Sequence, residues 1–304
     1  MTGLWNLQEV RDAFELGSVA TLALALMGVA VSTRARRQPF PLGGAVIAVG
    51  ALWSIAANRH VPAAVLVGVI GIGAVAALAH APPVSLWHCT ILALPFASLI
   101  GFQGELVTEV WARALVSGAI AVGSMLVADF DDTWRSETAG LTLFVVSALG
   151  VYATVPDTEL VGAVLGASLP LLLIGWPVRV ASLGRVGGAA ATALLLWAGA
   201  AGGGGRPASI VAVVVCLGLL VGVPIGTTLL PRAANRFGRV PPTPLVLALI
   251  AAHAVIVLTA ARVAGQRTDA LAAAALGALI GVAAVLIGAV FRPPSHAVVP
   301  ARVD

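Results

Sequence analysis

Residues 61–80 read VPAAVLVGVIGIGAVAALAH and contain no Asp, Glu, Lys or Arg. A membrane-spanning helix needs about 20 predominantly apolar residues, so this stretch has the length and the composition of one. Ten other stretches of the chain resemble it, although several are shorter. The eleven predicted spans are 17–32, 41–57, 61–80, 87–102, 112–128, 138–154, 160–178, 186–201, 209–230, 243–264 and 270–291. The sequence therefore predicts an all-α, polytopic integral membrane helix bundle.

The overall composition supports the same fold class. Of the 304 residues, 60% are hydrophobic and 10% are charged, and the mean hydropathy is +1.03. Soluble domains average about 45–50% apolar and about 25% charged residues. No room remains for a soluble catalytic domain, so we expect one transmembrane domain at 17–292 and a C-terminal tail at 293–304. The spans at 17–32 and 186–201 give the weakest signal, because the first is short and the second is rich in glycine. Ten helices are therefore the alternative.

The N-terminal residues have a different pattern. Leu4, Leu7, Val10 and Phe14 recur at helical spacing, and Glu9, Asp12 and Glu15 lie among or beside them. One apolar face on a short charged helix is typical of a helix that lies along the membrane surface. We therefore expect an interfacial amphipathic helix at 1–16.

Basic residues indicate the topology. All 17 are Arg, which excludes a Lys nucleophile or Schiff base. They are scattered singly through the loops, so we expect membrane lipids and no nucleic acid as partners. With eleven spans, eleven arginines fall on one side and six on the other. Because cytoplasmic loops are enriched in Arg, the N-terminus is expected outside the cell membrane and the C-terminus in the cytoplasm. With ten spans, both termini share one side.

Proline and glycine interrupt two of the predicted spans. The first interruption holds Pro170, Gly175 and Pro177, and the second holds Gly222, Pro224 and Gly226. Transporters often build a substrate site from such discontinuous helices near the bilayer midplane. The alternative is a structural kink without a ligand.

His253 lies near the middle of the span 243–264. Ionisable side chains inside a bilayer are costly and often serve function. We expect either a proton acceptor or substrate contact, or a hydrogen bond to a neighbouring helix.

The densest polar cluster contains Asp129, Asp131, Asp132 and Glu137 and lies between two spans. Carboxylates are ligands for Mg²⁺, and membrane transferases use aspartate-rich motifs to hold a lipid pyrophosphate through Mg²⁺. The alternative is that these acids cap a helix N-terminus.

Four further acids fall on the predicted outer face, namely Asp157, Glu159, Glu105 and Glu109. Pro156 followed by acids is typical of a helix start, so capping explains the first two. Glu105 and Glu109 are four residues apart and share a face if they are helical. The functional hypothesis for these acids is a mouth that attracts cations.

The leading hypothesis is a transporter or flippase of a small molecule or a lipid-linked precursor, without cofactor. The first alternative is a membrane-embedded transferase that requires Mg²⁺ and acts on a lipid pyrophosphate. The second is a non-catalytic accessory or scaffold subunit of a larger membrane complex. Cys89 and Cys216 lack the spacing of metal ligands, so no metal site is expected.

Overall fold

The computed structural model describes residues 12, 15–19, 43–58, 60–78, 85–103, 110–133, 139–154, 158–175 and 182–202. Within these ranges every regular element is a helix, which confirms the all-α class. A helical segment at 15–19 precedes α2 (Gly43–Asn58), α3 (Ala63–Leu78), α4 (Leu86–Gly101), α5 (Val110–Thr133), α6 (Ala139–Thr154), α7 (Thr158–Gly175) and α8 (Arg185–Gly202). No helix in this part of the chain is long and apolar enough to cross a membrane.

The apolar stretches of the sequence locate these helices well. The predicted span 138–154 corresponds to α6 and the span 186–201 to α8, each within one residue at both ends. Helix α5 differs most, because it was expected to end at residue 128 and continues to Thr133. Backbone hydrogen bonds hold a helix whether or not its side chains are apolar, so α5 passes through the acidic residues. The spans 209–230, 243–264 and 270–291, and most of 17–32, lie outside the described residues.

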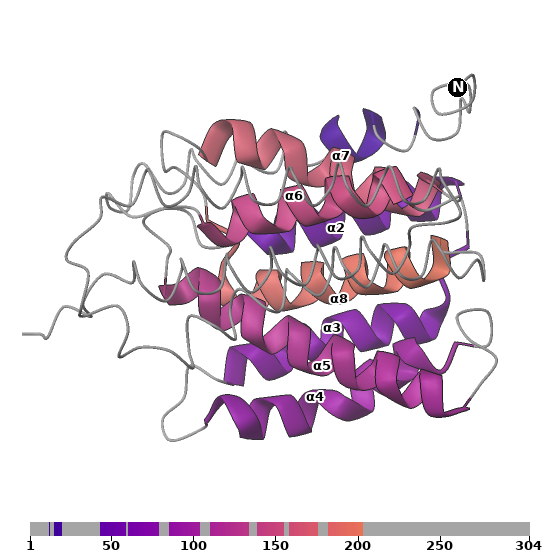
Figure 1. Cartoon of the computed structure of the whole chain (residues 1–304). Coiled ribbons are helices and arrows are strands. Elements are labelled where there is room, and N and C mark those ends of the chain that lie inside the picture. The colour runs from indigo at the N-terminus through magenta and orange to yellow at the C-terminus, as the bar shows by residue number, and fades with distance from the viewer. Residues whose placement is uncertain are drawn as a thin grey trace, which may run out of the picture.

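The helices lie side by side with roughly parallel axes (Figure 1). Links of three to nine residues join each helix from α2 onward to the next, so consecutive helices run in opposite directions. We name the two ends of the bundle after the residues that bound α8. The Arg185 end holds the first residues of α2, α4, α6 and α8. The Gly202 end holds their last residues.

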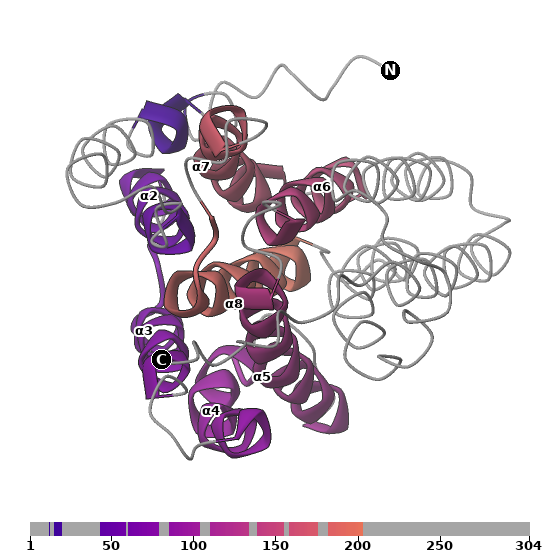
Figure 2. The same cartoon turned by 90° about the vertical axis from the view of Figure 1, so that its left-hand side faces the viewer.

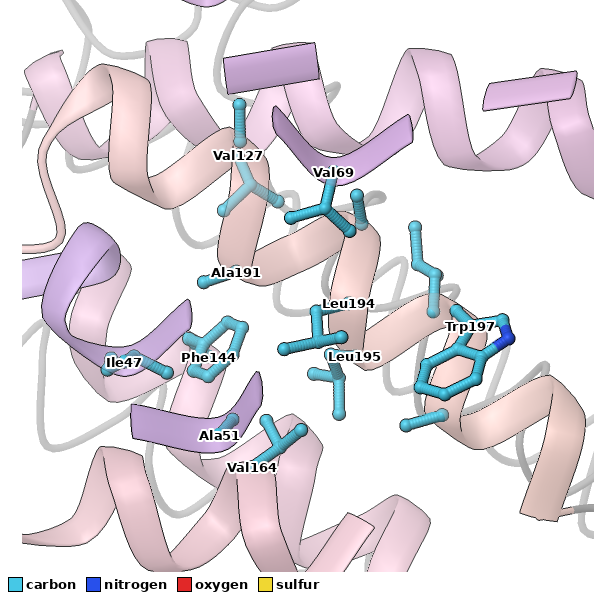
Figure 3. Close-up of a cluster of buried hydrophobic side chains, with 14 of the residues drawn as sticks. Ile47, Ala51, Val69, Val127, Phe144, Val164, Ala191, Leu194, Leu195 and Trp197 are labelled. Atoms are coloured by element: carbon cyan, nitrogen blue, oxygen red, sulfur yellow. The ribbon is translucent and has the colours of Figure 1, made fainter. Parts of the chain in front are cut away.

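Helix α8 occupies the centre of the described bundle (Figure 2). Helices α2, α3, α5 and α7 pack around it, and α4 lies farther out against α3 and α5. Leu194 and Leu195 of α8 are fully buried, and they lie among Phe144 of α6, Val164 of α7 and Ile47 of α2 (Figure 3). The core of the described helices therefore forms around the stretch that gave one of the weakest signals in the sequence.

At the Arg185 end, α2 and α8 touch backbone to backbone. A Cβ on Gly187 would lie 2.5 Å from the carbonyl carbon of Gly44 and 2.8 Å from the Cα of Ala45. The first two amides of α2 donate hydrogen bonds to the carbonyl oxygens of Ser182 and Leu183, at 3.1 and 2.6 Å. These bonds satisfy two of the four N–H groups that a helix start leaves free. Glycine is thus required on both sides of the crossing.

Candidate functional site

Helix α7 contains the first of the two expected interruptions. It runs without a break from Thr158 to Gly175, with Pro170 inside it. The expectation of a discontinuous helix at Pro170 is therefore wrong. Gly175 is the last residue of the helix, and Pro177 lies outside the described residues. Proline removes one backbone donor, and a helix can continue past it where another group satisfies the freed carbonyl.

The carbonyl that Pro170 frees belongs to Gly166, four residues earlier. Its partner comes from the other end of the described chain. The hydroxyl of Ser18 donates a hydrogen bond to the Gly166 oxygen, at 2.8 Å and across 148 positions of sequence. Ser168 is fully buried in the same turn and donates to the Leu165 carbonyl at 3.1 Å. The polar groups around Pro170 are therefore paired.

Gly17 makes the approach of Ser18 possible. This residue is buried, and a Cβ on it would lie 2.9 Å from the Ala163 oxygen and 3.2 Å from the Ala167 nitrogen. Both atoms belong to the backbone of α7, which cannot yield as a flexible side chain would. The segment 15–19 therefore lies directly on the turn of α7 that precedes Pro170.

The acidic cluster around Asp129 lies at the C-terminal end of a helix, whereas the capping alternative expected a helix N-terminus. Asp129, Asp131 and Asp132 belong to the last five residues of α5, so the hypothesis that they cap a helix N-terminus is wrong for these three. A helix C-terminus carries partial negative charge and disfavours acids, so a nearby cation is favourable for Asp129. Arg185 supplies it, because its Nη2 lies 3.3 Å from Asp129 Oδ1.

The Asp129–Arg185 ion pair links α5 to α8 at the Arg185 end. The side chain of Arg185 is 17% exposed and that of Asp129 is 31% exposed, so the pair is partly shielded from solvent. The carboxylate of Asp129 thus already has a cationic partner from the protein. Glu137, the fourth acid of the cluster, lies outside the described residues. No group of three His, Cys, Asp or Glu residues in the described ranges is arranged to hold a metal ion.

Glu159 lies in the first turn of α7, as the helix-start pattern predicted. A carboxylate is favourable at this position, because free N–H groups and the helix dipole both attract negative charge. The side chain is only 6% exposed, which the sequence pattern did not indicate. Burial makes Glu159 part of the protein interior at the Gly202 end and shields its side chain from solvent.

The remaining predicted site residues cannot be placed. Asp157, Glu105, Glu109, His253, Gly222, Pro224 and Gly226 lie outside the described residues. The structure adds three positions that sequence reasoning missed. The hydroxyls of Ser124, Ser182 and Thr192 are buried without a hydrogen-bond partner among the described residues. Two of them, Ser124 in α5 and Thr192 in α8, are fully buried inside the bundle.

Comparisons with known proteins give no independent assignment. No protein-family model matches this chain, and no curated protein matches it. Function must therefore be argued from the residues themselves.

Proposed function

We propose that this chain is a multi-pass membrane protein that transports or flips a small molecule or a lipid-linked precursor. The observation that supports membrane insertion is the distribution of charge along the described helices. From α2 to α8, every Asp, Glu and Arg lies within five residues of a helix end. The central parts of these helices have exposed apolar side chains, including Val67 and Ile70 of α3 and Ile91 of α4. In water, exposed side chains at the centre of a helix are usually polar, whereas contact with lipid tails requires apolar side chains there.

Exposed tryptophans support the same proposal. Trp87 and Trp111 are the second residues of α4 and α5, and their side chains are 72% and 66% exposed. Because α4 and α5 run in opposite directions, the two indoles lie at opposite ends of the bundle. Tryptophan is enriched at both membrane–water interfaces, where its ring contacts lipid and its N–H contacts water.

Because no described helix is long and apolar enough to cross a membrane of standard thickness, insertion requires the bilayer to thin around the bundle. A 16-residue helix such as α3 rises about 24 Å, compared with a hydrocarbon core of about 30 Å. A short apolar span is accommodated when the bilayer thins locally or flanking side chains extend to the interface. The cost is a fraction of a kcal/mol per Å of mismatch, roughly, so this difference does not exclude insertion.

A pair of positions with matched exposure tests the insertion. Ile70 lies in the middle of α3 and Val110 is the first residue of α5, and their side chains are 67% and 68% exposed. Each is changed to Cys in a Cys89→Ala, Cys216→Ala background and treated with a membrane-impermeant thiol reagent in native membranes. We expect Val110→Cys to react and Ile70→Cys to resist, because lipid excludes the reagent. After denaturation in detergent both should react. Equal labelling in native membranes would contradict insertion.

The transport part of the proposal depends on polar groups within the apolar spans. Pro170 frees a backbone carbonyl inside α7, and a side chain from a distant segment satisfies it. Transporters use backbone carbonyls of discontinuous helices near their substrates, and the candidate for such a helix is the predicted span with Gly222, Pro224 and Gly226, outside the described residues. His253, in a span outside the described residues, is the candidate proton acceptor.

Thiol labelling tests transport separately. Single cysteines at positions 220–227 and 253 are treated with the same membrane-impermeant thiol reagent in intact cells and in inverted vesicles. Labelling from both sides is expected for alternating access, whereas no labelling would indicate a dry bundle. For His253→Phe we expect loss of the pH dependence of transport. Unchanged pH dependence would remove His253 from the proposal.

One observation favours a second candidate, an accessory or scaffold subunit. Around α8 the described helices pack tightly through glycine and alanine, and their shared core is apolar. A static support for a larger membrane complex needs such packing and no substrate path. Purification in a mild detergent distinguishes the two, because a scaffold is expected to remain bound to a larger partner.

A further inference from the structure

Two buried hydroxyls differ from the other hydroxyls of the described helices. Ser117, Ser147 and Thr90 each donate to the carbonyl four residues earlier in their own helix, at 2.9, 2.8 and 2.9 Å. Ser124 in α5 and Thr192 in α8 do not, although a helix offers each of them a carbonyl at the same spacing. Both side chains are 0% exposed, and neither hydroxyl has a hydrogen-bond partner in the described part of the chain. Because buried polar groups are normally paired, these two hydroxyls point to a further group that bonds them.

The two hydroxyls lie at nearly the same depth in the bundle. Helices α5 and α8 pack against each other in opposite directions, and the Asp129–Arg185 ion pair marks a level that they share. Ser124 lies five residues before Asp129, which is about 7.5 Å along α5. Thr192 lies seven residues after Arg185, which is about 10.5 Å along α8 and on the same helix face. The two levels therefore differ by about 3 Å, which is less than one helical turn.

The residues around the two hydroxyls favour an uncharged ligand. Residues 116–128 of α5 and 186–201 of α8 contain no Asp, Glu, Arg or His. A charged ligand at this depth would find no counter-charge on either helix, and an unpaired charge in the interior is costly. A hydroxyl both donates and accepts, so two of them suit a small group that does the same. Water is the smallest molecule of this kind, and buried waters commonly bridge polar groups that have no other partner.

We propose that Ser124 and Thr192 form a shared site, at mid-depth of the bundle, for one small uncharged hydroxyl ligand. The ligand is a water molecule or the hydroxyl group of a polar solute, and it bonds both side chains at once. The site does not depend on the transport proposal, because it requires only two buried hydroxyls on adjacent helices.

A double-mutant cycle of the full chain in lipid nanodiscs tests the site. Ser124→Ala and Thr192→Val each remove one hydroxyl and little else, since valine has the shape of threonine. Each variant loses a hydrogen bond to the ligand, so its Tm is expected to fall by about 2–5 °C. The double variant is expected to fall by clearly less than the sum, because the first substitution already releases the shared ligand.

Glycerol distinguishes the two sources of the hydroxyl group. The cycle is measured in buffer alone and again with glycerol as the probe solute. Non-additive losses in buffer alone identify water as the ligand. Non-additive losses that appear only with glycerol identify a solute, and either result supports the site.

Two control variants keep the interpretation clear. Ser147→Ala removes a buried hydroxyl that bonds within its own helix, to the Leu143 carbonyl. Its effect on the Tm should add to that of Ser124→Ala or Thr192→Val without coupling. Thr192→Ser retains the hydroxyl and should keep the coupling to Ser124, also where Thr192→Val fails to fold.

The direction of the Tm shift decides the outcome. Without a ligand, each substitution removes an unpaired hydroxyl from the interior, which leaves the Tm unchanged or raises it. Single variants that keep or gain stability, or losses that simply add in both solutions, would overturn the proposal. Thiol labelling at positions 220–227 and 253 tests transport separately, so failure of this site and failure of the transport proposal are distinguishable.

Discussion

The crossing of α2 and α8 gives the sharpest prediction about stability. Gly187→Ala places a methyl group 2.5 Å from the carbonyl carbon of Gly44 and 2.8 Å from the Cα of Ala45. The backbone nitrogen of Ala45 is nearer still, and ordinary van der Waals contact begins near 3.4 Å, so the helices must separate by more than about 1 Å. The neighbouring atoms are backbone and cannot rotate away. Separation also stretches the two hydrogen bonds from the start of α2 to the carbonyls of Ser182 and Leu183.

These terms set the magnitude. Overpacking costs about 1–3 kcal/mol. Two weakened hydrogen bonds increase the loss of stability by about 0.5–1.5 kcal/mol each. The better helix propensity of alanine offsets about 1 kcal/mol of that loss. We therefore expect the free energy of unfolding to fall by about 1–5 kcal/mol, which lowers the Tm by about 2–20 °C in a chain of this size.

The assay is thermal unfolding in nanodiscs, followed by circular dichroism. Gly118→Ala is the matched control, because no atom lies within 4 Å of a Cβ built at that position. That variant should be neutral or slightly stabilised, since Gly118 is also inside a helix. Amide exchange at the start of α2 should increase only in Gly187→Ala. If both variants melt alike, the close approach of α2 and α8 is not as described, and the reasoning is refuted.

Four other predictions concern a glycine turn, the ion pair, Mg²⁺ and the core. Gly184→Ala should lower the Tm through a loss of about 1–2 kcal/mol, because Gly184 has φ 74°, which disfavours a Cβ; an unchanged Tm would contradict this. A double-mutant cycle of Asp129→Asn and Arg185→Gln should give a coupling of about 1 kcal/mol or less that weakens with salt. Mg²⁺ should not raise the Tm, and a rise that Asp129→Asn abolishes would favour the transferase alternative. Leu195→Ala should destabilise by about 2–4 kcal/mol through the cavity it leaves, whereas Leu115→Ala, at a 65% exposed position, should cost under about 0.5 kcal/mol in the same melting assay.

The positions of the described helices were largely predictable. Hydropathy rises and falls with the helices because each apolar stretch is bounded by polar or charged residues, as Ala139–Thr154 illustrates. Where the acids begin before the helix ends, as in α5, the same signal stops too early. The signal for 186–201 was weak because glycine and alanine are only mildly hydrophobic. Those small residues are nevertheless what allows α8 to lie at the centre, with neighbours in close contact.

The candidate site was less predictable. Proline at 170 identifies Gly166 as a carbonyl without a helical donor, and this much follows from the sequence alone. The proline does not identify Ser18 as the donor, because nothing in the sequence around a distant hydroxyl shows which carbonyl it bonds. In the same way, the acids near residue 129 were visible, but their pairing with Arg185 depended on how α5 and α8 pack.

The sequence by itself determined the all-α class, the approximate ends of the described helices and the proline in α7. These properties are local, since they follow from hydropathy and backbone geometry over a few turns. Only the tertiary structure decided which helix lies at the centre, which glycines meet, and which distant side chain satisfies the carbonyl that Pro170 frees. The reason is physical: apolar side chains pack on many neighbours with similar energy, whereas a backbone contact or a buried hydrogen bond requires one particular partner at one particular distance.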